Sequence, residues 1–132
     1  MLASSKKTAP VVKIFGAKEI TTNTIEINES LGEELNIEGY HYIGLKMPAA
    51  WDTANITFMV SEKSEDDDGE YMDLYGADGV EIVINAAASR AISVDVVDSA
   101  LAPWSYIKIR SGTTGTPVVQ TAEREIIISL KG

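Results

Sequence analysis

Apolar and polar residues alternate with a period of two along most of this chain. The alternation begins at Val11 and is clearest in segments rich in β-branched residues: 25–27, 41–47, 56–60, 80–84, 92–96, 107–109 and 126–130. Successive side chains of a strand point to opposite faces, so this period predicts strands with one buried face. Turn residues separate the segments, and Asp78-Gly79 is a typical tight turn.

The predicted strands are short and follow one another at intervals of roughly 8–12 residues, which is typical of two-sheet β-proteins. We therefore expect an all-β fold, an antiparallel two-sheet β-sandwich of jelly-roll or related topology. The order of the strands stays open, because periodicity does not encode pairing. The one helical turn we expect lies around Asp98 to Leu101, with Asp98 or Ser99 as its cap and Pro103 as its end.

A chain of 132 residues has the length of a single domain. Residues 1–10 are small, polar or basic, include Lys6 and Lys7 and end at Pro10. We expect them to form an extended N-terminal arm that orders only when it docks against something. Residues 11–132 are then one β-sandwich domain, with no cysteine for a disulfide or a thiolate metal site.

Charge and hydropathy argue against two classes of partner. The formal net charge of −9 predicts repulsion from the phosphate backbone, so we expect no nucleic-acid partner. No apolar run approaches the roughly 18–20 residues that a membrane-spanning helix needs, and no apolar segment of a signal peptide follows Lys6 and Lys7. We expect a soluble protein without a membrane partner.

The sequence offers little for catalysis, and we expect neither an enzyme nor a cofactor. His41 is the only histidine, and no nucleophile near it has the spacing of a catalytic triad. It shares a predicted strand face with Ile43, which favours a packed or hydrogen-bonded histidine at the edge of the core. The connection at 112–117 is rich in glycine and threonine but lacks the lysine and the helix of a phosphate-binding loop.

The acidic run at 62–70 is a weak candidate for a calcium site, centred on Asp66, Asp67 and Asp68. Calcium takes several oxygen ligands from a flexible loop, but the spacing here does not match an EF-hand. A solvated charged loop is the more ordinary interpretation.

Aromatic residues form the second candidate, because Trp51, Tyr71, Tyr75 and Trp104 lie in or beside predicted loops. Rings in such places can stack on sugars, so a glycan site is possible. The alternative is that Trp51 and Trp104 close the ends of the sandwich as large buried rings.

Charges alternate on two late segments, with Lys108 and Arg110 on one and Glu123 and Glu125 on the other. If these segments pair with each other, cross-strand ion pairs form without any ligand.

From about Leu31 to its C-terminus the chain resembles a family of small β-sandwich proteins encoded among the structural genes of tailed phages. The resemblance rests on these stretches: GLKMPAAW at 44–51 with ITF at 56–58, Tyr71 with DLY at 73–75 and DG at 78–79, IKIRSGT at 107–113 with TPV at 116–118, and Ala122 with Arg124. The segment at 64–70 departs from the family by being more acidic.

The resemblance implies a β-sandwich in a virion and supplies no catalytic motif. It suggests a capsid decoration, cement or head-fibre module, made in the host cytoplasm, that binds the major capsid protein or other virion proteins. We also expect it to self-associate, with a trimer as the expected oligomer. The alternative is a carbohydrate-binding module that serves host adhesion on the head, tail or baseplate.

Overall fold

The computed structural model describes residues 18–95 and 100–132. Their strands are β1 (Lys18–Ile25), β2 (Leu35–Asn36), β3 (Tyr42–Lys46), β4 (Ile56–Ser61), β5 (Met72–Asp73), β6 (Ala91–Asp95), β7 (Tyr106–Ser111) and β8 (Arg124–Lys131). A 3-10 helix, η1 (Glu65–Asp67), follows β4. The expected arm with Lys6, Lys7 and Pro10, and the cap of the expected helical turn at Asp98 and Ser99, lie outside the described residues.

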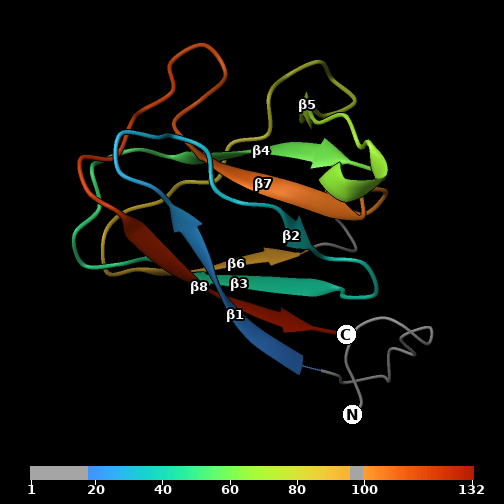
Figure 1. Cartoon of the computed structure of the whole chain (residues 1–132), viewed down its shortest axis with the longest axis horizontal. Helices are drawn as coiled ribbons and strands as arrows, with labels where there is room; N and C mark the ends of the chain where they lie inside the picture. The colour runs from blue at the N-terminus through green and yellow to red at the C-terminus, as the bar shows by residue number, and fades with distance from the viewer. Residues whose placement is uncertain (1–17, 96–99) are drawn as a thin grey trace.

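The strands form two antiparallel sheets, one in the order β1-β8-β3-β6 and the other in the order β2-β7-β4-β5. In this arrangement the first strand pairs with the last, the second with the second last, and so on inwards. The pairs β3–β8 and β4–β7 then join these hairpin-like pairs into sheets. A long hairpin rolled up in this way is a jelly roll, so the predicted sandwich is confirmed. Figure 1 shows the two sheets stacked as layers.

The core fills the space between the layers and consists of the inward side chains predicted by the alternation. Fully or almost fully buried are Ile43, Leu45, Ile56, Phe58, Val60, Ile107, Ile109, Ile126, Ile128 and Leu130. Apolar burial of this kind contributes roughly 25 cal/mol for each Å² removed from water. The period-two pattern therefore identified the element type and the buried face of these strands.

Two predicted stretches differ from the expectation. Ile27 is 55% exposed, because β1 ends at Ile25 and Asn28 turns the chain with a positive φ of 68°. The segment 80–84 forms no strand, and its β-type pairing is limited to the isolated bridges Tyr75–Glu81 and Ile56–Ile84. Its apolar side chains Ile82 and Ile84 pack against the core from a loop. The alternation of apolar residues in this segment therefore reflects packing from a loop and not from a strand.

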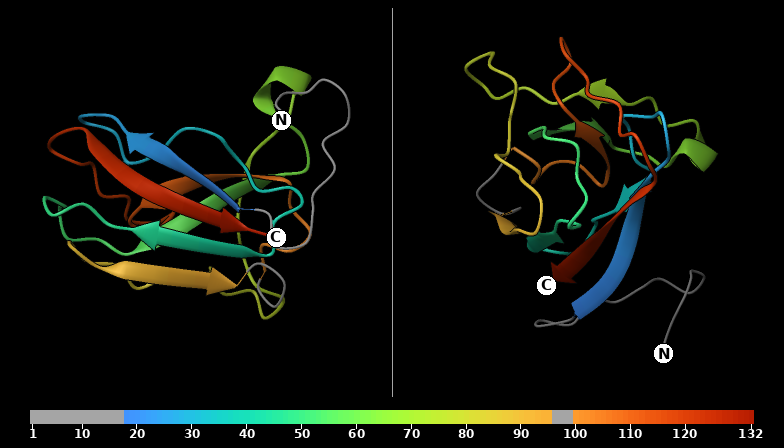
Figure 2. Two further views of the ribbon diagram at one scale, coloured as in Figure 1. Left: turned by 90° about the horizontal axis from the view of Figure 1, so that it is seen from below. Right: turned by 90° about the vertical axis from the view of Figure 1, so that its left-hand side faces the viewer.

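Connections gather at two ends of the sandwich, seen from another side in Figure 2. The Trp51 end comprises the β3–β4 and β7–β8 connections, which are fastened to each other by hydrogen bonds. The Trp104 end comprises the β2–β3 turn, η1 and the segment before β7. Among the described residues there is no helix with the length and hydropathy that crossing a bilayer requires.

Candidate functional site

A shallow hollow of about 330 Å³ opens at the Trp104 end. Its walls are the β2–β3 turn (residues 37–41) and the segment 102–105. Backbone hydrogen bonds join the two walls, since Ile37 N donates to Ser105 O at 2.9 Å. The turn is closed by Tyr40 N, which donates to Ile37 O at 3.1 Å, with Gly39 at the positive φ of 85° that favours glycine.

The hollow combines one aromatic wall with a few polar groups. Trp104 is half-buried against the core, and its backbone N donates to Leu101 O at 3.0 Å. Glu38 is exposed and accepts a hydrogen bond from Ser105 Oγ at 3.3 Å. His41 is exposed beside them. The hollow therefore offers a ligand one aromatic ring and a few polar groups.

Tyr40 contributes a buried ring and a hydroxyl that is already hydrogen-bonded within the chain. Its OH donates to Glu19 Oε1 at 2.7 Å. Burial, followed by the hydrogen bond and the charge of Glu19, raises the pKa of Tyr40 to about 12. The phenol therefore stays protonated and holds the start of β1 to the wall of the hollow.

The structure does not gather the four candidate aromatic residues into one surface. Trp51 is 7% exposed at the opposite end, where its Nε1 donates to Ala54 O at 3.1 Å, as a ring that closes the sandwich does. Tyr71 donates from its OH to Glu34, and Lys108 Nζ lies 4.7 Å from its ring centroid. Tyr75 is exposed on the loop after β5. Trp104 alone among them lines the hollow.

The acidic segment folds into a capped turn. Ser64 Oγ accepts from Asp66 N at 3.0 Å at the start of η1, and Asp68 ends it in the left-handed region. Within residues 18–95 and 100–132, no group of three or more His, Cys, Asp or Glu side chains is placed to hold a metal ion. The carboxylates of Asp66, Asp67 and Asp68 do not converge on a calcium position.

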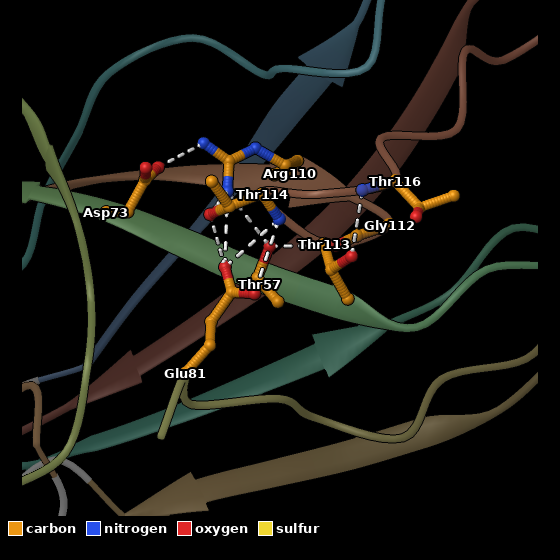
Figure 3. A network of polar contacts seen from close by, with 8 residues as sticks. All are labelled: Thr57, Asp73, Glu81, Arg110, Gly112, Thr113, Thr114 and Thr116. Carbon is orange, nitrogen blue, oxygen red and sulfur yellow. Dashed lines mark hydrogen bonds and ion pairs between the residues drawn. The ribbon is translucent and has the colours of Figure 1, made fainter. Parts of the chain in front are cut away.

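Arg110 is the centre of a polar network on the outer side of the β2-β7-β4-β5 sheet (Figure 3). Its guanidinium donates to Asp73 Oδ1 at 2.5 Å, to Thr114 Oγ1 at 2.9 Å and to Glu81 Oε2 at 3.4 Å. Thr114 Oγ1 donates in turn to Glu81 Oε2 at 2.6 Å. Thr57 donates to the carbonyl of Gly112 at 2.8 Å. The network fastens two loops over the sheet.

The cross-strand ion pairs required the two late segments to pair with each other, and they do not. β7 and β8 belong to different sheets, so Lys108 and Arg110 do not face Glu123 and Glu125. Lys108 instead forms an ion pair with Glu65 of η1. Alternation identified the face on which these charges lie, but it does not encode which strands pair.

A second network closes the Trp51 end. Arg124 Nη2 donates to Asp52 Oδ1 at 2.9 Å, and Thr121 N donates to Asp52 Oδ2 at 2.8 Å. Burial alone would raise the pKa of Asp52, but the hydrogen bonds from Thr121 and Arg124 and the guanidinium charge outweigh it and lower that pKa. The completely buried Gln120 joins this network, and no periodic feature of the sequence marks it.

His41 does not lie at the edge of the core as expected. Its side chain is exposed, and its ring meets the Tyr42 ring edge-on with centroids 6.4 Å apart. Its backbone N donates to Lys131 O at 2.9 Å, which continues the β3–β8 pairing by one residue. The alternation put His41 on the inward side, but β3 begins only at Tyr42.

Solved structures with a similar fold include the SPBc2 prophage-derived protein YomS, with a TM-score of 0.51 and 14% identity over 90% of this chain and 98% of YomS. The Yersinia pseudotuberculosis-derived mitogen gives a TM-score of 0.38 and 12% identity, covering 89% of this chain and 86% of its own. A protein of the Bacillus endospore appendages, which form disulfide-linked pili, gives 0.37 and 10%, covering 96% of each chain. No family model and no curated protein matches the sequence.

Proposed function

We propose that this chain is a non-enzymatic structural protein of a phage virion. It serves as a capsid decoration, cement or head-fibre module and attaches to the particle through protein–protein contacts. The observation that carries the proposal is the jelly-roll order of its strands, an architecture of viral capsid domains that it shares in fold with a prophage-derived protein.

The use of its buried polar groups supports a structural role. The guanidinium groups of Arg110 and Arg124 both bind carboxylates from neighbouring loops of the same chain. Such contacts hold loops in place and present a fixed outer surface to a partner. A rigid surface loses little conformational entropy on docking, which favours stable attachment.

The partners that we propose are the major capsid protein or other virion proteins, together with further copies of this chain, with a trimer as the expected oligomer. The protein is made in the host cytoplasm and ends in the virion. Residues 1–10, with Lys6 and Lys7, are proposed to reach an acidic groove on a neighbour and to become ordered there.

Analysis of purified particles tests this function. Particles released from the host that encodes the chain are examined by quantitative mass spectrometry and by immunogold electron microscopy. We expect the chain at a fixed copy number per particle, and a chain that lacks residues 1–10 folded but absent from particles. Particles that carry no copies would refute the function, and attachment of the shortened chain would refute only the role of the arm.

We propose carbohydrate binding as a second candidate function, favoured by the hollow beside Trp104. One half-buried indole, the carboxylate of Glu38 and the hydroxyl of Ser105 are the groups with which a site binds a neutral sugar. The surrounding acidic charge of Glu19 and Glu38 disfavours phosphorylated or sulfated ligands. This function is compatible with a place on the virion.

The two tryptophans allow a test with an internal control. The indole N–H signals of Trp51 and Trp104 are followed by two-dimensional nuclear magnetic resonance while glucose, galactose, mannose or N-acetylglucosamine is added to millimolar concentrations. We expect one of these sugars to shift the Trp104 signal saturably and to leave the Trp51 signal in place, because Trp51 Nε1 is buried and bonded to Ala54 O. An unmoved Trp104 signal with all four sugars would exclude the site for this ligand class.

A further inference from the structure

The outer face of the β1-β8-β3-β6 sheet is one continuous four-stranded surface, and Figure 2 (left) shows its strands side by side, with a twist from β6 to β1. The strand register aligns Ile20, Ser129, Gly44 and Ser93 in one row across the sheet. The next row contains Thr22 and Ile127. Ile20 is 63% exposed and Ile127 is also exposed, so this surface, here called the flat face, presents apolar area to its surroundings.

The flat face is less acidic than the chain as a whole. It carries the exposed lysines Lys18, Lys46 and Lys131 and the exposed acid Glu125. The register also places Asp95 in the row of Tyr42 and Lys131. The chain as a whole has a formal net charge of −9. A face with basic residues around an uncharged centre is suited to a flat or narrow partner of negative charge.

Gly44 lies at the centre of this face, and the fold of the single chain does not require a glycine there. A Cβ at Gly44 would lie 3.6 Å from Ser129 Cβ, which is ordinary van der Waals contact. Its φ is not in the positive region where glycine is favoured. A glycine inside a strand lowers stability relative to alanine and often marks the close approach of another surface. The flat face is therefore adapted to a neighbour that comes close to β3.

The chain itself carries a surface of opposite charge, the acidic segment 62–70. Glu62, Glu65, Asp66, Asp67 and Asp68 are all exposed there. The segment is preformed, because Ser64 caps η1, and a Cβ at Gly69 would collide with the carbonyl oxygen of Lys63. Figure 1 shows η1 beside β4 and β7, on the opposite sheet from the flat face, so one copy presents both surfaces outward.

We propose that the flat face binds the acidic segment 62–70 of a second copy of this chain. A second flat face would bring further lysines to this surface, whereas the acidic segment brings mainly carboxylates to it. The contact joins two different surfaces, so it closes into a ring or continues as a filament. This contact would account for the self-association in the proposed function, and its biological role rests on that function.

Sedimentation velocity of the full chain tests the contact without any particle. At low ionic strength we expect a mass several times the 14.2 kDa of one chain, falling to that of the monomer near about 1 M salt, where charges are screened within about 3 Å. Gly44→Ala should raise the melting temperature of the monomer yet weaken association at least tenfold. These opposite changes separate a docking role from a structural one.

Charge reversal gives the matched control. Lys46→Glu should weaken association at least tenfold, while Lys63→Glu, the same charge change within the acidic segment, should not weaken it. Adding Asp67→Lys to Lys46→Glu should restore part of the loss. A chain that stays monomeric at low salt overturns the proposal. So does an oligomer that neither Gly44→Ala nor Lys46→Glu weakens. Equal weakening of the oligomer by Lys46→Glu and by Lys63→Glu overturns it as well. None of these results bears on the detection of the chain in particles.

Discussion

Arg110 illustrates at the scale of one residue how this fold uses charge. It points away from the core, yet it is only 8% exposed, because the loops that carry Glu81 and Thr114 cover it. A buried guanidinium is costly unless carboxylates and hydroxyls satisfy its donors. Asp73, Glu81 and Thr114 do so here.

Replacing Arg110 should therefore cost far more stability than replacing its neighbour. Arg110→Met leaves the partly buried carboxylates of Asp73 and Glu81 without their counter-charge, and we expect a loss of about 3 kcal/mol in the free energy of unfolding. Lys108→Met removes an ion pair to Glu65, whose side chain is 50% exposed, and should cost under about 1 kcal/mol. Urea denaturation measures both, and equal losses would show that the Arg110 network is only a surface contact.

The sequence predicted on which side of its strand such a residue lies, but not which other residues surround it. Alternation placed Arg110 opposite the buried Ile107 and Ile109, which is correct. It did not reveal that Arg110 is covered, because two of the residues around its guanidinium, Glu81 and Asp73, are 29 and 37 positions away in the sequence. Trp104 is a similar case, since the other wall of its hollow, around Glu38, is distant in sequence.

At the level of the elements, the side chain of Gln120 makes four of the hydrogen bonds that fasten the long connection between β7 and β8. Gln120 Nε2 donates to Ser111 Oγ at 2.7 Å and to Asp52 O at 3.2 Å. Gln120 Oε1 accepts from Asp52 N at 2.9 Å and from Arg124 Nε at 3.1 Å. This buried amide links the β3–β4 connection, the end of β7 and the start of β8.

Gln120→Leu keeps most of the buried volume and removes all four hydrogen bonds. Several buried or partly buried groups then lose a partner, and we expect a loss of about 2–4 kcal/mol in the free energy of unfolding. Thr121→Val is the control, because the Thr121 hydroxyl bonds Asp52 at an exposed position and its removal should cost about 1 kcal/mol or less. Thermal or urea unfolding compares the two, and a Gln120→Leu variant as stable as the control would contradict this role.

The elements themselves were predictable where alternation, length and turn residues agreed. β4, β7 and β8 fulfil all three conditions, and their inward residues are buried. β2 and β5 have only two residues each, too few to show a period. The segment 80–84 shows the two-residue alternation, but it forms a loop beside the sheet that pairs only through isolated bridges. Pairing order is a tertiary property, so the sequence left the jelly roll as one topology among several.

At the scale of the whole molecule, three tyrosines make the Trp104 end sensitive to high pH. Burial and the nearby charges of Glu19, Glu34 and Glu38 raise the pKa values of Tyr40, Tyr71 and Tyr106, that of Tyr40 to about 12. Loss of the phenol proton would leave a negative charge on a partly buried oxygen close to a carboxylate, which is why each pKa is raised.

The sign of the pH dependence follows from these shifts. A folded pKa above the unfolded value of 10.0 gives a contribution that is complete below about pH 10 and is lost as the pH rises towards about 12 for Tyr40. We expect urea midpoints to fall over this range and to fall less in Tyr40→Phe than in the unchanged chain. If the urea midpoint changed with pH equally in the two proteins, the pKa of Tyr40 would be the same in the folded and the unfolded chain.

A cryo-electron microscopy reconstruction of purified particles, made with and without the gene for this chain, tests the virion role most directly. We expect density on the particle for two stacked four-stranded sheets, lost when the gene is deleted, with the β1-β8-β3-β6 sheet turned towards a neighbouring copy. Identical reconstructions from both kinds of particle would contradict it.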